Sequence, residues 1–129
     1  GPTAEVEVSS EDLCEGSCID VTFTITSGSG GPYDLVWEVD AGITIPIPWT
    51  TDVESETWSI CTTPGFLPDW DPGTMTATVP DFLTFIEVQL ISVSENGCEG
   101  EVQSDVIAIN IVEPPTANSA GPLTAGCVE

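Results

Sequence analysis

The stretch from residue 19 to residue 27, IDVTFTITS, alternates strictly between apolar and polar side chains. Its apolar set would face one side of a sheet: Ile19, Val21, Phe23 and Ile25. A period of two with one polar face is typical of an antiparallel strand that has a core on one side and water on the other. Residues 4–9 and 33–40 alternate in the same way, so the chain is predicted to be built mainly from strands.

Less regular patterns predict five further strands, over residues 43–49, 53–61, 74–79, 82–94 and 102–112. Pro46 and Pro48 make the first of these either an edge strand or an irregular crossing. In residues 82–94 the inward set is ambiguous: either Ile86, Val88 and Leu90 or Ile91 and Val93 break the alternation, which predicts a β-bulge. Asn96 and the glycine after it predict a hairpin turn, because both residue types accept positive φ.

No segment has the spacing of an amphipathic helix, and residues 62–73, with three prolines, predict a loop. Seven to nine short antiparallel strands without a helix indicate an all-β chain folded as a β-sandwich. Trp37, at an inward position of its strand, is expected in the core of that sandwich.

Charge excludes several kinds of partner. The 129 residues contain 22 Asp and Glu but no Lys, Arg or His, which gives a formal net charge of −22. Nucleic acid and anionic lipid are recognised through basic side chains, so neither is an expected partner. No apolar run approaches the ~20 residues of a membrane helix, and no membrane insertion is expected. Most of the carboxylates are interpreted as a solubility adaptation.

Catalysis is not expected from this composition. Ser/His/Asp and Cys/His nucleophilic sites need a histidine, and the chain has none. A carboxylate pair could serve a glycosidase or an aspartic protease. However, the Asp-Thr/Ser-Gly signature of aspartic proteases is missing, and the Asp-Pro-Gly at 71–73 has the composition of a turn.

The five cysteines lack the paired spacing of a zinc site. They are Cys14, Cys18, Cys61, Cys98 and Cys127. Five cysteines predict two disulfides and one leftover thiol in an oxidising, extracellular compartment. Spacing by itself leaves the choice among the pairings open.

The head of the chain recurs near its tail. Pro-Thr-Ala at 2–4 returns at 115–117 and Cys14 returns as Cys127, each pair 113 residues apart. Thr3 and Ala4 keep the match even if Gly1 and Pro2 are left over from tag removal. The chain is therefore interpreted as one repeat, residues 1–113, followed by a linker and the first strand of the next copy at 114–129. Cys127 would then be unpaired within this chain, its partner lying in the next copy.

Several motifs in order resemble a known family. CEGSC at 14–18, GSGGPYDLVW at 28–37 and SENGC at 94–98 are similar to repeats of SprB-type gliding-motility adhesins and related immunoglobulin-like, PKD-like modules of Bacteroidota surface proteins. The resemblance implies an immunoglobulin-like sandwich, exported by type IX secretion and displayed on the cell surface. It also implies a structural or adhesive repeat, whose partners are neighbouring repeats and possible surface polysaccharides.

The resemblance also implies the disulfides Cys14–Cys98 and Cys18–Cys61. Sandwich topology supports the second pair better, because the turn near Cys18 and the turn after Cys61 should lie at one end. Bridges of this kind contribute ~2–4 kcal/mol each.

Two candidate sites lie in the proline-rich middle of the chain. Asp69 and Asp71, two residues apart, could hold calcium weakly, at ~10⁻⁴–10⁻³ M, although solvated carboxylates are the simpler interpretation. Trp70, with Trp49 and Phe66, could stack on a sugar ring or could cap the open end of the sandwich. The alternative function is accordingly a calcium-dependent carbohydrate- or protein-binding module.

Overall fold

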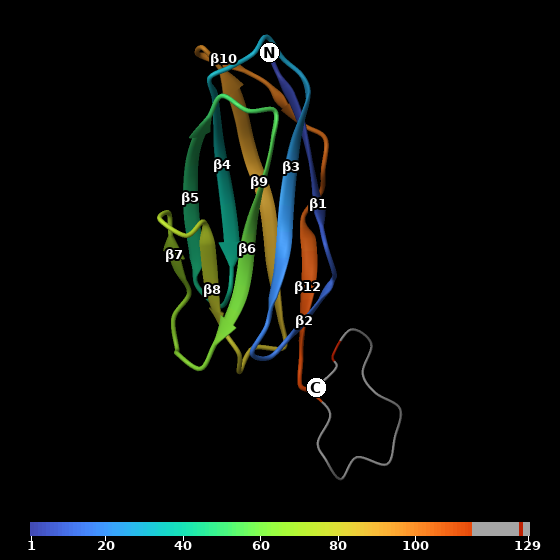
Figure 1. The fold of residues 1–129 in the computed structure, drawn as a ribbon, viewed down its shortest axis with the longest axis vertical. Helices are drawn as coiled ribbons and strands as arrows, with labels where there is room; N and C mark the ends of the chain where they lie inside the picture. Colours follow the sequence, from blue (N-terminus) through green and yellow to red (C-terminus); the bar gives the residue numbers. More distant parts are fainter. Residues whose placement is uncertain (115–126, 128–129) are drawn as a thin grey trace.

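The computed structural model describes residues 1–114 and residue 127. In that part the chain is all-β, without a helix, and its two sheets pack face to face as a sandwich (Figure 1). Since no helix forms there, none of the described segments could cross a membrane as a helix.

The first sheet has six strands in the order β11–β1–β3–β6–β8–β7. Their bounds are Glu101–Val102 (β11), Thr3–Val8 (β1), Cys18–Ser27 (β3), Ser55–Thr63 (β6), Thr76–Pro80 (β8) and Asp69–Asp71 (β7). Neighbours are antiparallel except for β1–β11 and β6–β8, which are parallel.

The second sheet runs β2–β12–β9–β4–β5, and β10 pairs with β9 beside this path. Its strands are Asp12–Cys14 (β2), Ile107–Val112 (β12), Phe85–Glu95 (β9), Tyr33–Asp40 (β4), Thr44–Thr51 (β5) and Cys98–Glu99 (β10). Here β2–β12 is the parallel pair.

Three parallel pairings and a count of twelve strands in the described residues differ from the seven to nine antiparallel strands expected. Eight of the twelve have five residues or more. The others are two- or three-residue pieces too short to show a period in the sequence. One of them, β7, lies inside the predicted loop at 62–73, because residues 69–71 pair with β8.

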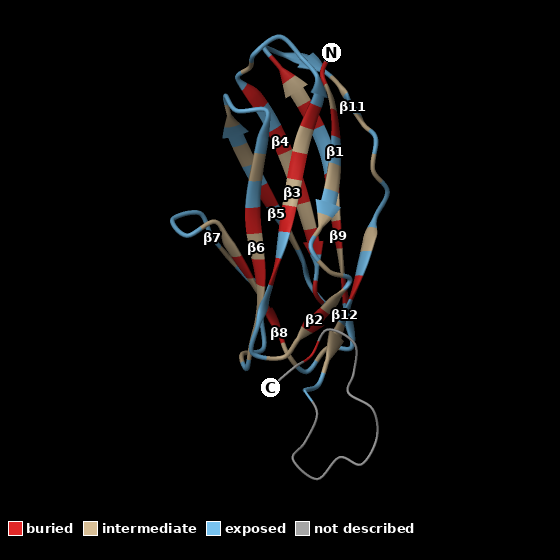
Figure 2. Ribbon diagram, turned by 45° about the vertical axis from the view of Figure 1, so that its right-hand side comes forward, coloured by how far each residue is buried: buried red, intermediate tan, exposed pale blue. Residues whose placement is uncertain are grey.

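The alternating patterns of β3 and β4 are confirmed. The inward residues on both strands are buried, and Figure 2 shows buried segments alternating along these strands. They are Ile19, Val21, Phe23, Ile25, Tyr33, Leu35, Trp37 and Val39. The bulge is confirmed as well: Val36 faces Ser92 and Trp37 faces Leu90, which leaves Ile91 without a cross-strand partner and 43% exposed. The hairpin turn is confirmed, with φ of 51° at Asn96 and 81° at Gly97.

Five aromatic rings form a closed cluster through the core. In order round the ring they are Phe23, Trp37, Trp58, Trp70 and Trp49, with successive centroids 5.2–6.1 Å apart. Trp37 is fully buried, as expected for the core tryptophan. The indole N–H groups of Trp37 and Trp58 have no hydrogen-bond partner among the residues that the structure describes. The two rings pack nearly edge to face at 5.2 Å, an arrangement that suits the aromatic quadrupole.

The sandwich has two distinct ends, the entry end and the exit end. The entry end carries Pro2 and the β9–β10 hairpin, and the exit end is where β2 and β12 stop, at Cys14 and Val112 (Figure 1).

One expected disulfide is confirmed and the other is wrong. Cys18 and Cys61 face each other across β3 and β6 and are bonded, with an S–S distance of 2.02 Å. Cys14 is bonded to Cys127, not to Cys98, and Cys98 is a free, exposed cysteine. The reason is the length of the sandwich: Cys14 lies at the exit end and Cys98 at the entry end. Cys127, expected to be unpaired, is therefore paired.

The proposed boundary at 113/114 falls just after β12. Residues 115–126 and 128–129, which carry most of the expected first strand of a next copy, lie outside the described residues.

Candidate functional site

On one side of the sandwich β5, the edge of one sheet, lies beside β7, the edge of the other (Figure 1), and residues on and around these strands line a groove. Its volume is about 310 Å³. Side chains from both sheets line it: Pro48, Trp49, Thr50, Glu56, Trp70, Pro72 and Met75. Met75 has a φ of 53°, an uncommon conformation for a residue with a side chain.

Trp49 and Trp70 form the aromatic wall of this groove. Both are half-buried, and their ring centroids are 5.8 Å apart with planes inclined by 38°. On the core side Trp49 packs edge-on against Phe23 and Trp70 edge-on against Trp58. The two rings thus cover the core at the side of the sandwich, between the two sheet edges, and not at an open end. Sugar stacking on Trp70 stays a prediction.

Glu56 joins the two sheets at the groove. The Nε1–H of Trp49 on β5 donates a hydrogen bond to Oε1 of Glu56 on β6, at 3.2 Å. Glu56 Oε2 has no hydrogen-bond partner among the described residues, and the side chain is half-buried. The groove therefore presents a carboxylate oxygen next to two indole rings, and the chain has no basic side chain that could neutralise it.

The edge strand β5 is closed to further strand pairing. Pro46 and Pro48 keep their places in the ladder with β4, opposite Glu38 and Val36. Proline has no N–H, so both residues must stand where the backbone points away from β4. The outer edge consequently offers carbonyl groups without donors at these two positions, which discourages pairing of another chain along it.

Asp69 and Asp71 are both exposed on β7. Asp71 accepts a hydrogen bond from the backbone N–H of Gly73 at 2.9 Å and so shapes the turn after the strand. Within the described residues no three or more His, Cys, Asp or Glu side chains gather as metal ligands would. Two carboxylates fall short of the six to eight oxygens that calcium takes, and calcium binding here stays a prediction.

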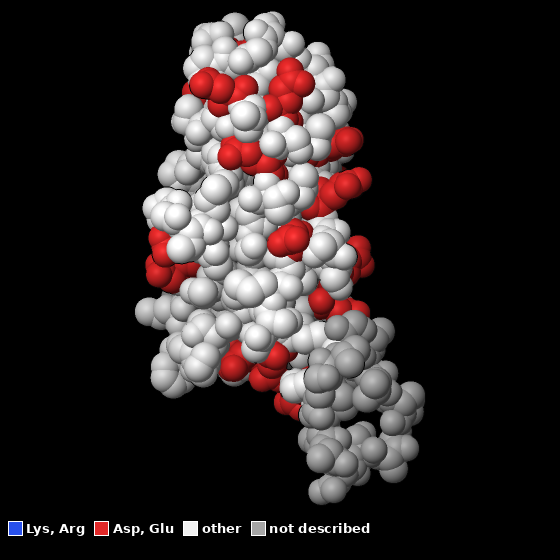
Figure 3. Space-filling model, in the orientation of Figure 1, with Lys and Arg blue, Asp and Glu red and all other residues white. Residues whose placement is uncertain are grey.

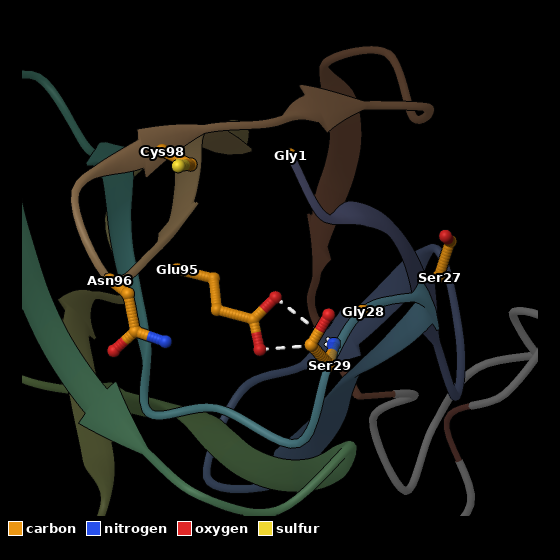
Figure 4. Close-up of a pocket in the computed structure, with 7 residues that line it drawn as sticks. All are labelled: Gly1, Ser27, Gly28, Ser29, Glu95, Asn96 and Cys98. Atoms are coloured by element: carbon orange, nitrogen blue, oxygen red, sulfur yellow. Dashed lines mark hydrogen bonds between the residues drawn. The ribbon is translucent and has the colours of Figure 1, made fainter.

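Glu95 holds the glycine-rich turn at the entry end, a role the sequence analysis missed. The side chain is 7% exposed, and its carboxylate accepts hydrogen bonds from the backbone N–H groups of Ser29, at 3.0 Å, and Gly31, at 2.7 Å. Figure 4 shows the carboxylate pointing at this turn. The glycine-rich turn at 28–31 was the feature of the sequence that could have predicted this role. Its backbone N–H groups need an acceptor once they are buried.

The exit end is apolar by comparison. Five of the eight exposed large hydrophobic residues described lie in its loops or at the adjoining strand ends, namely Ile43, Phe66, Leu67, Phe82 and Phe85. Phe66 is 84% exposed, and its ring lies 6.3 Å from that of Phe82. An apolar patch of this kind marks a surface suited to contact with another protein surface.

Acidic side chains border the same end. Partial burial raises the pKa of Glu15 above its ordinary value, and the negative charges of Asp81 and Glu113 raise it further. Figure 3 shows carboxylates spread along the visible face, with no basic side chain among them.

Comparisons with protein-family models, with curated proteins and with solved structures found no match.

Proposed function

We propose that the chain is a structural and adhesive repeat of an extracellular surface protein, in which sandwiches of this kind follow one another as beads. The observation that carries the proposal is the placement of the two chain ends. Glu101 N–H donates to the carbonyl of Pro2 at 2.9 Å at the entry end, whereas β12 stops at Val112 at the exit end. The 113-residue recurrence of Pro-Thr-Ala supplies the next copy at that exit.

This geometry suits a bead that carries tension. A pull on the two ends acts along β1 from the entry end and along β12 from the exit end. Each strand would have to shear its antiparallel ladder, β1 along β3 and β12 along β9, so that several hydrogen bonds resist together. The disulfide Cys18–Cys61 ties β3 to β6 and limits how far the first sheet can unravel.

The extracellular setting is supported by two disulfides, which persist in oxidising compartments. The order β2–β12–β9–β4–β5 opposite β1–β3–β6 supports an immunoglobulin-like topology, with the parallel β8 as a departure. Display by type IX secretion and a role in gliding depend on the family resemblance of the cysteine and glycine motifs.

Like charge would keep an array of beads extended, since each copy carries a net charge near −22 and self-repelling chains lengthen. The test is a two-copy chain made of residues 1–114 followed by residues 2–129. Small-angle scattering should give a maximum dimension close to twice that of one bead, with two folded units by calorimetry. A compact particle, or a second unit that does not fold, would overturn the proposal.

A second candidate function is suggested by the groove of Trp49, Trp70 and Glu56. Indole faces attract cations, and a carboxylate adds a charged acceptor. A ligand matched to this lining is a lysine or arginine side chain of a partner protein, since a planar guanidinium can stack on indole while it bonds a carboxylate. A surface sugar would use the same indole faces and is the competing ligand.

Fluorescence of the tryptophans during titration with an arginine-containing peptide, its citrulline counterpart and an oligosaccharide would separate these ligands. Glu56→Gln should weaken the arginine peptide about tenfold, the ratio that ~1.4 kcal/mol represents. Glu7→Gln removes one charge from exposed β1 and is the matched control. If both variants weaken binding of the arginine peptide equally, the effect comes from overall charge and not from Glu56. If the bead binds the oligosaccharide more tightly than the peptide, the sugar is the favoured ligand.

A further inference from the structure

Cysteines stand at both ends of the bead: the two disulfides lie at the exit end, and the free Cys98 lies at the entry end. We propose that Cys98 of each bead forms a disulfide with Cys14 of the bead before it. The inference rests on the tandem array proposed above and names the contact between neighbours. It makes the junction between beads covalent in two places, the peptide linker and the disulfide.

Cys98 lies where the chain enters the bead. It opens β10 on the β9–β10 hairpin and is exposed, without a disulfide. It lines the same pocket as Gly1, and Figure 4 draws the two together. Three residues further on, the backbone N–H of Glu101 donates a hydrogen bond to the carbonyl of Pro2, near the start of the chain. The thiol is thus on the surface that a preceding bead would face.

Cys14 lies where the chain leaves. It is the cross-strand partner of Val112, the last residue of β12, and the next backbone nitrogen, that of Glu15, donates to the Val112 carbonyl at 3.0 Å. Its sulfur already takes part in a disulfide at this end, with Cys127. The exit end therefore holds a disulfide where a following bead would begin.

The linker brings the two positions within reach. Pro115 corresponds to Pro2 in the recurrence, so only Glu113 and Pro114 separate Val112 from the entry of a following copy. Three Cα–Cα steps cover at most about 11 Å. The entry end of the following bead, with its Cys98, must then lie close to Cys14.

The observed bond to Cys127 cannot persist in such an array. Cys127 corresponds to Cys14, so in a folded following copy it would lie at that copy's own exit end. The eleven residues of β9 are joined by ten steps of about 3.3 Å, so the strand is about 33 Å long, which approximates the length of one bead. Cys127 cannot both bond Cys14 and occupy its place at the far end of a second sandwich.

Thiol–disulfide exchange connects the two arrangements without an added oxidant. The Cys98 thiolate of the following bead attacks Sγ of Cys14, the Cys14–Cys127 bond breaks, and its electron pair leaves on Cys127 Sγ, which takes up a proton. One disulfide is formed and one is lost. Cys127 is then free to fold as the Cys14 of its own copy.

Charge explains why a covalent junction would be useful. No copy has a basic side chain, so no side-chain ion pair can join two beads, and their carboxylates repel. Attraction is left to apolar contact, and Phe66 and Phe82 at the exit end provide it. A disulfide beside that contact would hold the beads in one orientation and stiffen the filament.

The experiment uses the two-copy chain, equilibrated in a glutathione redox buffer, quenched by alkylation and digested with a protease that cuts after glutamate. Trypsin has no site in this sequence. The expected map has Cys14 of the first copy joined to Cys98 of the second, both Cys18–Cys61 bonds, the Cys14–Cys127 bond of the second copy, and one alkylated thiol, Cys98 of the first copy. Cys98→Ser in the second copy should remove the junction peptide, whereas Cys98→Ser in the first copy, the matched control, should leave it intact.

A single-bead variant gives an independent check. Cys127→Ser in the 129-residue chain should leave two alkylatable thiols, Cys14 and Cys98, because a bead cannot join its own ends. Zero thiols in monomeric material would show an internal Cys14–Cys98 bond and overturn the proposal. Two folded beads with both Cys98 thiols free would overturn the junction disulfide while leaving the array standing. A two-copy chain that fails to form two beads would overturn both.

Discussion

The carboxylate of Glu95 lies 2.7 Å from the backbone nitrogen of Gly31, almost wholly out of contact with water. A negative charge is held there by backbone N–H groups alone, since the chain has no basic side chain to pair with it. The same turn is also held to the start of β4, because Gly30 N–H donates a hydrogen bond to the hydroxyl of buried Tyr33 at 3.0 Å.

Glu95→Gln should destabilise the bead by about 1–3 kcal/mol, because an amide replaces one acceptor oxygen by a donor that faces other donors. Urea unfolding at pH 7 measures the change. Glu99→Gln, on the exposed strand β10, removes a charge nearby and should stay within about 0.5 kcal/mol of the parent. Equal effects of the two variants would show that Glu95 does not organise the turn.

Replacing both Cys18 and Cys61 by alanine should cost about 2–4 kcal/mol, since the bond restricts the unfolded chain across 43 residues. The midpoint of urea unfolding, with and without reductant, measures the loss. Cys98→Ser is the matched control and should leave the midpoint unchanged, because that thiol is exposed and unbonded. A reductant effect that persists in the double variant would have to come from Cys14–Cys127.

Salt should stabilise the bead, because it screens repulsion among carboxylates that have no opposite charges. The melting temperature should rise between 0.01 M and 0.15 M sodium chloride, as the screening length falls from about 30 Å to about 8 Å. Calcium chloride at equal ionic strength tests the Asp69–Asp71 prediction. A rise beyond that of sodium, lost in Asp69→Asn with Asp71→Asn, would establish a calcium site; equal curves would rule out one of millimolar affinity.

Glu15 should make the bead more stable in mild acid. Because partial burial raises its pKa in the folded state, the folded bead holds this proton more tightly than the unfolded chain does. The stabilisation is complete below the ordinary pKa of about 4.5 and is lost as pH rises through the raised value. Glu15→Gln imitates the protonated form. It should therefore raise the urea concentration at the midpoint of unfolding at pH 7 and leave that concentration nearly unchanged at pH 4.

Glu7→Gln removes the same charge from exposed β1 and serves as the control for that comparison. If it matches Glu15→Gln at both pH values, net charge and not the surroundings of Glu15 accounts for the gain.

Local features of the fold were predictable from sequence because they depend on neighbours along the chain. Alternation in β3 places Phe23 in the core, the break after Leu90 becomes the bulge at Ile91, and Asn96 with Gly97 turns the hairpin. Each follows from the two-residue period of a strand or from the φ that a residue tolerates. Cys18–Cys61 was implied by the family resemblance and supported by the expectation that its two turns lie at one end, and the strands that carry it do pair directly.

The sequence by itself therefore determined an all-β chain, the inward faces of its main strands, and a surface that can form no side-chain ion pair. Only the tertiary structure decided that Cys14 is a sandwich length from Cys98, that Trp49 and Trp70 close one aromatic cluster beside Glu56, and that residues 69–71 pair as an edge strand. These relationships depend on the order of strands within each sheet and on how the sheets face each other. Strand order is set by the packing of the whole core, and a two-residue period carries no information about it.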